Sequence, residues 1–348
     1  MTSALDRAAY VIGQGARVGL FMGQSWLSGR LTKPVKAARP ITGPFPSTAR
    51  LRRDMAKLFA QDWRNIEAGH YRVPHDLIAS PIQALAKAAP YFADLRGVER
   101  RRHARDGAEL RSDEKLEDLK EDFPAYYLQN FHYQTDGYLS RRSADLYDHQ
   151  VEVLFTGAAD AMRRQALVPL AAFLAERRSA ETSLLDLACG TGRFLTFVKD
   201  NYPRLQVTAL DLSPAYLDKA RALLAPWRGV DFQCAPAEAS GFSDESQDVI
   251  TCIYLFHELP RKVRGQIARE AKRLLKPGGR LIFLDSIQLG DMPDYDGLLQ
   301  YFPEAFHEPF YADYQRDDLE GTFAAAGLEL VASELAYFSR LMVLAKAP

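Results

Sequence analysis

A glycine-containing turn between a predicted strand and a predicted helix carries the residue types that point most directly to chemistry. Residues 184–194 read Leu-Leu-Asp-Leu-Ala-Cys-Gly-Thr-Gly-Arg-Phe. Two glycines at such a junction let the backbone approach a ligand and leave helix N–H groups directed at it. A second predicted strand, 207–211, ends in Asp211, about 20 residues further on, where nucleotide-binding folds place a carboxylate for the ribose hydroxyls. We therefore expect a nucleotide-type ligand at this turn.

Two departures from the dinucleotide pattern narrow the ligand. The pattern G-x-G-x-x-G needs a third glycine beneath the pyrophosphate, and Leu195 stands at that place. Asp186 precedes the first glycine, and its negative charge suits a ligand with a positive amino group better than a diphosphate. These residues resemble the first motif of the class I S-adenosylmethionine-dependent methyltransferases, which has an acid before Gly-x-Gly. The resemblance covers about residues 145–348 and rests on four separate motifs in the family's order.

The resemblance implies S-adenosylmethionine as the cofactor and S-adenosylhomocysteine as its product. Asp186, Gly190 and Gly192 are expected around the methionine part, and Asp211 at the ribose. Other residues expected beside the cofactor are Ala188, Cys189, Leu212 and Tyr254.

The predicted adenine loop departs from the family's usual Asp-Ala pattern. Ala237 and Glu238 stand where the family has adenine-contacting residues, but Pro236 occupies the place of the usual acid. Proline offers neither a carboxylate nor an N–H. Recognition of the adenine amino group therefore falls to Glu238 or to a backbone carbonyl.

Strands and helices alternate in the second half of the chain, which predicts an α/β fold. The resemblance implies a Rossmann-like, mostly parallel, seven-stranded sheet with an antiparallel C-terminal hairpin, preceded by a mainly helical N-terminal domain. The domains are expected at 1–143 (substrate or lid domain, with a basic arm) and 144–348 (cofactor domain). Ser213 and Pro214 predict a helix start, and 276–279 a tight turn. The predicted strands after 184–187 are 207–211, 230–234, 247–254, 280–284, 328–336 and 338–345.

Residues 7–53 form a basic arm without a single acidic residue. Its charged residues are Arg7, Arg17, Arg30, Lys33, Lys36, Arg39, Arg50, Arg52 and Arg53. Gly15, Gly19 and Gly23 share one helix face, where another helix could approach closely. Two interpretations stay open: a helical lid packed on the body with solvated bases, or contact with an anionic membrane surface. No nucleic-acid-binding motif is present, so a nucleic acid partner is not expected.

Residues 123–140, just before the predicted cofactor domain, are dense in aromatic side chains. Related methyltransferases have a lid over the cofactor and substrate at this place. The alternative is an interdomain core in which tyrosine hydroxyls satisfy backbone groups. The residues expected to line a substrate pocket here are Tyr126, Tyr127, His132, Tyr133 and Tyr138.

Candidates for proton transfer follow the later strands, because open parallel sheets bind ligands beyond the carboxyl ends of their strands. The cofactor already carries a leaving group, so the enzyme mainly aligns the reactants. A base is needed only if the acceptor keeps its proton until attack, and histidine suits that role. His257 is the leading candidate and His307 the alternative, each with a structural hydrogen-bonding role as the competing interpretation. Glu258, Glu308 and Tyr311 are expected in the substrate pocket.

Composition is consistent with this assignment. The chain has 348 residues and a net charge of −1. We find neither a secretory signal nor a long apolar run, and we expect a cytoplasmic protein, with peripheral membrane contact through the arm as an open alternative. We expect Cys189, Cys234 and Cys252 to be buried free thiols, and no metal site.

Together, these features predict methyl transfer to the oxygen or carbon, less readily the nitrogen, of a hydrophobic or aromatic small molecule. Two other classes remain as alternatives. One is a catalytically silent cofactor-binding module in an assembly. The other, disfavoured by the missing third glycine and the closing hairpin, is a nicotinamide-dependent oxidoreductase. The oligomeric state and the identity of the acceptor are left open.

Overall fold

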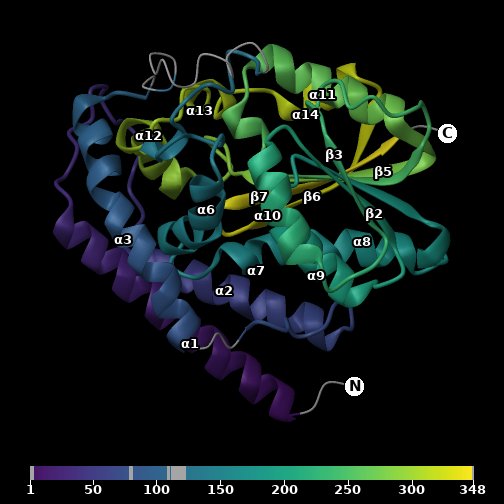
Figure 1. Cartoon of the computed structure of the whole chain (residues 1–348), viewed down its shortest axis with the longest axis horizontal. Helices are drawn as coiled ribbons and strands as arrows, with labels where there is room; N and C mark the ends of the chain where they lie inside the picture. The colour runs from purple at the N-terminus through teal and green to yellow at the C-terminus, as the bar shows by residue number, and fades with distance from the viewer. Residues whose placement is uncertain (1–3, 78–80, 108–109, 111–122, 347–348) are drawn as a thin grey trace.

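The computed structural model describes residues 4–77, 81–107, 110 and 123–346, and a seven-stranded sheet organises its C-terminal part (Figure 1). The strand order is β3-β2-β1-β4-β5-β7-β6. β7 is antiparallel to β5 and β6, and the other neighbours are parallel. The strands are β1 Ser183–Leu187, β2 Gln206–Asp211, β3 Val230–Cys234, β4 Gln247–Ile253, β5 Leu275–Ser286, β6 Leu328–Ala336 and β7 Ser339–Lys346. The predicted fold, including its closing hairpin, is confirmed.

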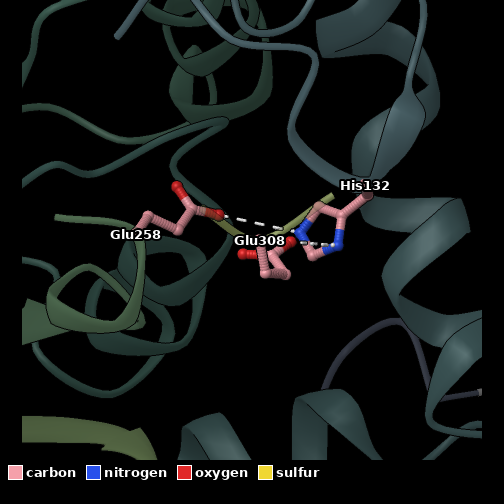
Figure 2. Close-up of side chains that lie close together, drawn as sticks. All are labelled: His132, Glu258 and Glu308. Atoms are coloured by element: carbon pink, nitrogen blue, oxygen red, sulfur yellow. Dashed lines mark ion pairs between the residues drawn. The ribbon is translucent and has the colours of Figure 1, made fainter. Parts of the chain in front are cut away.

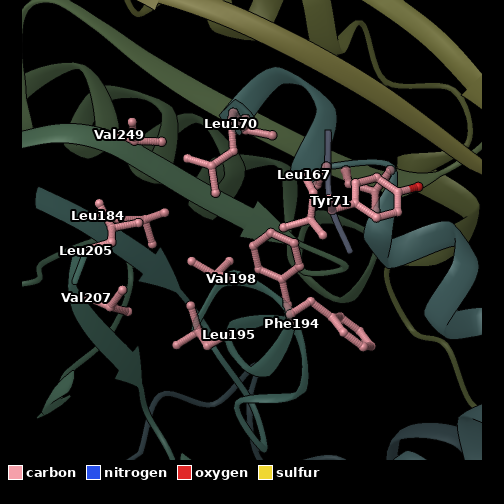
Figure 3. Close-up of a cluster of buried hydrophobic side chains, with 14 of the residues drawn as sticks. Tyr71, Leu167, Leu170, Leu184, Phe194, Leu195, Val198, Leu205, Val207 and Val249 are labelled. Carbon is pink, nitrogen blue, oxygen red and sulfur yellow. The ribbon is translucent and has the colours of Figure 1, made fainter. Parts of the chain in front are cut away.

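Helices cover both faces of the sheet, as the apolar central strands require. On one face, Leu184, Val207 and Val249 pack against helices α8 and α9 (Figure 3). Helix α10 contributes further side chains to the same cluster. On the other face, Ile250 and Phe283 pack against helices α11 to α14. The helices of the two faces are α8 Leu167–Leu174, α9 Arg193–Asn201, α10 Pro214–Leu224, α11 Arg261–Leu274, α12 Asp296–Ala305, α13 Tyr311–Tyr314 and α14 Leu319–Ala325.

The N-terminal part consists of helices that pack against the sheet unit. Tyr10 and Trp63 belong to the same buried cluster as Leu184 of β1. Asp62 is fully buried and accepts hydrogen bonds from Arg164 and from Tyr10, whose hydroxyl lies 2.7 Å away. This core is continuous across the boundary expected after residue 143. The two-domain division stays a prediction. The helices are α1 Ala4–Leu31, α2 Thr48–Glu67, α3 Pro81–Ala104, α6 Arg141–Leu154 and α7 Ala159–Arg164. Short 3-10 turns are η2 Phe131–Tyr133, η3 Ser179–Glu181, η4 Phe256–Glu258 and η5 Pro293–Tyr295.

Local chemistry explains where the predicted elements agree with the structure and where they differ. Ser213 caps α10 and accepts a hydrogen bond from the Tyr216 amide, as predicted. The turn predicted at 276–279 is instead part of β5, which begins at Leu275. Gly278 has a φ of +73° there, and the pairing register of β4 with β5 shifts between Gln247 and Val249. The glycines therefore make a bulge inside a longer strand.

Two expectations about side-chain exposure were wrong. Cys234 is exposed, because β3 is an edge strand of the sheet. Arg17 is not solvated: it lies 2.8 Å from Glu152 and 2.5 Å from Asp160, both buried. The close helix approach predicted for the arm is also not made by the described residues, since nothing lies within 4 Å of a Cβ built on Gly15. Among the residues that the structure describes, we find no helix with the length and hydropathy needed to traverse a bilayer.

Candidate functional site

A cavity of about 120 Å³ lies at the carboxyl ends of β1, β2 and β4, where the predicted cofactor turn is found. The predicted cofactor residues that line it are Asp186, Ala188, Cys189, Gly190, Asp211, Leu212, Ala237, Glu238 and Tyr254. The predicted pocket residues that line it are Tyr126, Tyr127, Tyr138 and Glu258. Residues that line it without having been predicted include Tyr147, Asp148, Arg163, Thr191, Arg193, Phe194 and Tyr216.

Strained backbone shapes the ends of the two central strands. Ala188 after β1 and Tyr254 after β4 have φ values of +57° and +58°, a region that disfavours side chains. Such strain persists where the surrounding structure holds it, and it is concentrated at functional sites. Gly190 has a φ of +55°, and no described atom lies within 4 Å of a Cβ built on it. The turn therefore leaves open space over its backbone, as a ligand cradle needs.

The two glycines of the turn have different roles. Gly192 is the N-cap of α9, with a φ of +77°. A Cβ at Gly192 would lie 2.9 Å from Leu224 Cδ1 and 3.1 Å from Ala220 Cβ, both on α10. Gly192 is therefore needed for close packing of α9 against α10, whereas Gly190 lines the cavity.

Asp186 and Asp211 are buried acids at the base of the cavity. Burial raises the pKa of Asp186 to about 7, although a hydrogen bond from Thr251 at 2.6 Å opposes the shift. Burial also raises the pKa of Asp211 to about 6, against hydrogen bonds from the Ser213 and Gly190 amides, both at 2.8 Å. Two desolvated acids gain from a ligand that brings an ammonium group and hydroxyl donors.

The opposite wall holds a cation that the sequence did not single out. The Arg163 guanidinium lines the cavity and donates to Asp160 at 3.1 Å. Asp148 accepts a hydrogen bond from the Thr191 hydroxyl at 2.8 Å and so connects α6 to the glycine turn. Arg163 places a positive charge where a ligand carboxylate could lie. Neither residue belongs to a motif. Packing of α6 and α7 over the glycine turn brings both of them to the cavity.

The aromatic segment covers the cavity and contacts the adenine loop. The Tyr126 hydroxyl donates to Glu238 at 2.6 Å, and the Tyr138 hydroxyl donates to Glu258. Tyr138 also packs edge-on against Tyr147 and Tyr216, with ring centroids 6.0 and 5.4 Å away. The segment thus combines the two predicted interpretations, because its tyrosines are packed together and also form a cavity wall.

Other predicted pocket residues lie outside this cavity. Tyr133 packs on the His307 ring, at 5.6 Å between centroids. The Tyr311 hydroxyl lies 2.7 Å from Ser286 Oγ. His307 Nε2 lies 2.9 Å from Gln129 Oε1. The alternative base His307 is thus placed in loop packing, away from the cavity wall.

Carboxylates and imidazoles alternate in a row beside the cavity. His257 Nδ1 lies 2.6 Å from Asp285 Oδ1, and its Nε2 lies 3.8 Å from Glu258 Oε1. His132 Nε2 lies 3.7 Å from the same Glu258 oxygen, and its Nδ1 lies 2.8 Å from Glu308 Oε1 (Figure 2). Glu258 is the member of the row that lines the cavity.

Both imidazoles in this row are expected to be protonated at neutral pH. Burial lowers the pKa of each, but the neighbouring carboxylates outweigh it. The Asp285 carboxylate raises the pKa of His257 to about 9. Glu308 and Glu258 raise the pKa of His132 to about 10. A protonated His257 is an acid rather than a base, which favours Glu258 as the proton acceptor.

His132, Glu258 and Glu308 also have the side-chain types of a metal site, with one ligand atom from each within 4.8 Å of the others. However, the two imidazole nitrogens face different carboxylates (Figure 2). That arrangement, with the raised histidine pKa, is that of an imidazolium held between two anions.

Comparisons with known proteins agree with this geometry. Residues 184–279 match the family model described as "Methyltransferase domain". The chain is 36% identical over 103 residues to the ubiquinone/menaquinone biosynthesis C-methyltransferase UbiE of Desulfotalea psychrophila, covering 30% of this chain and 41% of that protein. It is 32% identical over 143 residues to a demethylmenaquinone methyltransferase of Deinococcus radiodurans, covering 41% of this chain and 56% of that protein. The chain therefore spans about half the length of the curated relatives it matches.

Among solved structures, the chain resembles a 1,6-didemethyltoxoflavin-N1-methyltransferase from Burkholderia thailandensis, whose structure holds S-adenosylhomocysteine. The identity is 18% and the TM-score 0.42, covering 58% of this chain and 84% of that one.

The C-terminal part of this chain is a class I S-adenosylmethionine-dependent methyltransferase domain. S-adenosylmethionine is accordingly the cofactor of this domain. The residues of the cavity fit that molecule: the open Gly190 backbone, buried Asp186 for an ammonium group, and buried Asp211 for ribose hydroxyls.

Proposed function

We propose that this protein transfers a methyl group from S-adenosylmethionine to an oxygen or a carbon of a hydrophobic or aromatic small molecule. The observation that carries this proposal is that predicted acceptor residues and predicted cofactor residues line one cavity. Tyr138 and Glu258 line the same cavity as Asp186 and Asp211. An acceptor resting on the aromatic side would therefore face the cofactor directly. The relatives named above are by their names C-methyltransferases and quinone-pathway enzymes, and an O-methyltransferase of Penicillium expansum is 31% identical over 153 residues.

The cofactor supplies an activated methyl group on a positively charged sulfur, and the chain's own residues supply binding and orientation. Asp186 would bind the ammonium group, Arg163 the carboxylate and Asp211 the ribose. Tyr126, held on Glu238 at 2.6 Å, would exclude water from the adenine side. These contacts fix the direction of attack, which is the main contribution that a methyl transfer requires.

Proton removal from the acceptor falls to Glu258 in this proposal. Its carboxylate lines the cavity and lies between the His132 and His257 imidazoliums, at 3.7 and 3.8 Å. An acceptor hydroxyl or acidic C–H placed there would pass its proton to Glu258 as the new bond to carbon forms. Tyr138 orients this carboxylate by hydrogen bonding.

The test is incubation of the purified protein with cofactor labelled in its methyl group and with a solvent extract of cells. We expect label in an apolar small-molecule fraction, and its mass spectrum identifies the acceptor atom. A protein that binds the cofactor but leaves all extracts unlabelled would be a silent binding module. Label only in macromolecules would contradict the assignment of a small-molecule acceptor.

We also infer that the arm contacts an anionic membrane surface through α1. Its outward face exposes apolar side chains, with Ile12 at 68%, Trp26 at 63% and Leu31 at 61% exposure. Arg30 lies over the Trp26 ring, 4.8 Å from its centroid, and the exposed bases Lys33 and Arg39 follow. An apolar helix face bordered by bases and an aromatic ring complements a bilayer with negative headgroups.

A further inference from the structure

A second cavity, of about 260 Å³, lies between α1, α3 and α6, which contact one another (Figure 1). Its walls are largely apolar, and none of the motifs in the sequence accounts for it. The apolar and aromatic residues that line it are Tyr91, Leu95, Val98, Tyr147, Val151, Val153, Leu154 and Phe306. The charged groups at its edge are paired, Arg102 with Glu99 at 3.1 Å and His132 with Glu308 at 2.8 Å. Such a cavity suits an uncharged apolar group.

Helix α6 borders both this cavity and the cofactor cavity, and one side chain belongs to both. Tyr147 lines the two cavities. Beside it, Asp148 faces the cofactor cavity and Val151 faces the apolar one. The histidine–carboxylate row crosses the same boundary, because His132 lines the apolar cavity and lies 3.7 Å from Glu258 in the cofactor cavity. The two cavities therefore adjoin at Tyr147 and at the His132–Glu258 pair.

The apolar cavity adjoins the last turns of α1, where neighbouring side chains are exposed. Ser25, Ser28 and Gly29 of α1 line the cavity, as does Thr32 just after the helix. Trp26 and Leu31, on the same stretch of helix, are 63% and 61% exposed. An apolar chain leaving a bilayer at this face would therefore meet the cavity with little contact with water.

We propose that the cavity between α1, α3 and α6 binds the apolar tail of an amphiphilic methyl acceptor, whose polar ring head lies at Tyr147 beside Glu258. This inference rests on the proposed function for the fate of the head group, but tail binding is a property of the cavity alone. It defines the acceptor class as a ring-bearing amphiphile with an alkyl-type tail, rather than a compact polar metabolite.

The test compares binding of 4-hexylphenol and of phenol, which share a head and differ in the tail. Binding to the full chain is measured by calorimetry in the presence of S-adenosylhomocysteine. We expect 4-hexylphenol to bind at least 30-fold more tightly than phenol, because the apolar tail leaves water. Equal affinities for the two compounds would overturn the proposal.

A pair of glycine variants locates the tail. No atom of the described residues lies within 4 Å of a Cβ built on Gly29, which lines the cavity, or on Gly15, on the same helix away from the cavity. Gly29→Leu should weaken 4-hexylphenol binding at least fivefold, while Gly15→Leu should leave it within twofold. Unchanged binding in Gly29→Leu, with a wild-type circular dichroism spectrum, would contradict the proposal.

Titration with S-adenosylmethionine in the same variants separates this inference from the proposed function. We expect wild-type cofactor affinity in both glycine variants. Tail binding without any cofactor binding would refute the proposed methyl transfer and leave the apolar site standing. Cofactor binding with equal affinities for 4-hexylphenol and phenol would refute the apolar site and leave the proposed methyl transfer standing.

Discussion

Asp186 and Asp211 are buried acids whose pKa values burial raises to about 7 and about 6. Below these values each acid is neutral and offers the cofactor no charge. We therefore predict that the affinity for S-adenosylmethionine increases about tenfold between pH 5.5 and 7.5, as both acids ionise. Calorimetric titrations across that range measure it. In Asp186→Asn the affinity should depend less on pH, and the midpoint of the dependence should move to a lower pH. An affinity that falls with rising pH would contradict the binding roles of the two acids.

Substitutions at Gly190 and at Gly192 should have different effects, the first on ligand binding and the second on packing. In Gly192→Ala the new methyl group meets α10, at 2.9 Å from Leu224 Cδ1, and φ is +77°. We predict a loss of about 1–3 kcal/mol in the free energy of unfolding, from strain and overpacking. Gly190→Ala meets no described atom within 4 Å, so it should lose less stability but weaken cofactor binding about tenfold. Urea unfolding and calorimetry measure the two effects, and equal behaviour of the variants would refute the distinction.

Glu258 is the proposed proton acceptor, and its amide variant keeps the shape of the side chain. We predict that Glu258→Gln lowers kcat at saturating cofactor and acceptor by about 10²–10⁴-fold, the usual contribution of a general base. Cofactor affinity should stay within threefold of the wild type. His307→Asn is the matched control, because His307 is placed in loop packing near Gln129. Full turnover in Glu258→Gln would remove the carboxylate from the mechanism.

The residues closest to the sequence motifs were the predictable ones. Asp186, Gly190 and Asp211 follow from their spacing, and all three line the cavity. Arg163 and Tyr147 line it too, but neither stands in a motif. Their positions depend on how α6 and α7 pack over the glycine turn, and a sequence pattern does not encode such a distant contact.

At the scale of elements, α1 has two apolar faces, one buried against the body and one exposed. Its inner face packs on the body through Tyr10 and Phe21, which are 3% and 7% exposed. The outer face keeps exposed apolar side chains such as Ile12 and Trp26. The basic composition of the arm suggested either a lid or a membrane contact, and the two roles would use different faces of the helix.

The membrane contact predicts how exposed residues of α1 behave. We expect Ile12→Ser combined with Trp26→Ser to reduce cosedimentation with phosphatidylglycerol vesicles at least tenfold, because the variant loses apolar area at the interface. Val331→Ser combined with Leu335→Ser is the control, since these residues of β6 are 57% and 48% exposed. Binding that is unaffected in the α1 variant, or that is as strong with neutral vesicles, would refute the contact.

Strand positions were predictable because apolar runs and turn residues mark them, and the limits of β2, β3 and β6 agree with the expectation within one residue. The start of β5 was missed for a physical reason. Lys276-Pro-Gly-Gly279 has the composition of a turn, but pairing of Gln247 with Leu275 holds this segment in the sheet as a bulge. Tertiary pairing here outweighs local preference.

At the scale of the whole molecule, the N-terminal helices and the methyltransferase domain share one core. Trp63 of α2 and Leu170 of α8 belong to the same buried cluster as Leu195 of α9. The aromatic segment closes over the cofactor cavity through the Tyr126–Glu238 hydrogen bond. The part of the chain without a recognisable motif therefore contributes tyrosines to the cavity wall, and we propose that it forms the acceptor side, which its sequence alone does not identify.

The account depends most on the identity of the cofactor, and one titration tests it directly. Wild-type protein and Asp211→Asn are titrated by calorimetry at pH 7.5 with S-adenosylmethionine, and the wild type also with NADH. We predict micromolar binding of S-adenosylmethionine, at least tenfold weaker binding in the variant because the ribose loses its carboxylate, and no heat with NADH. Binding of NADH alone, or equal affinity of the variant and the wild type for S-adenosylmethionine, would contradict the account.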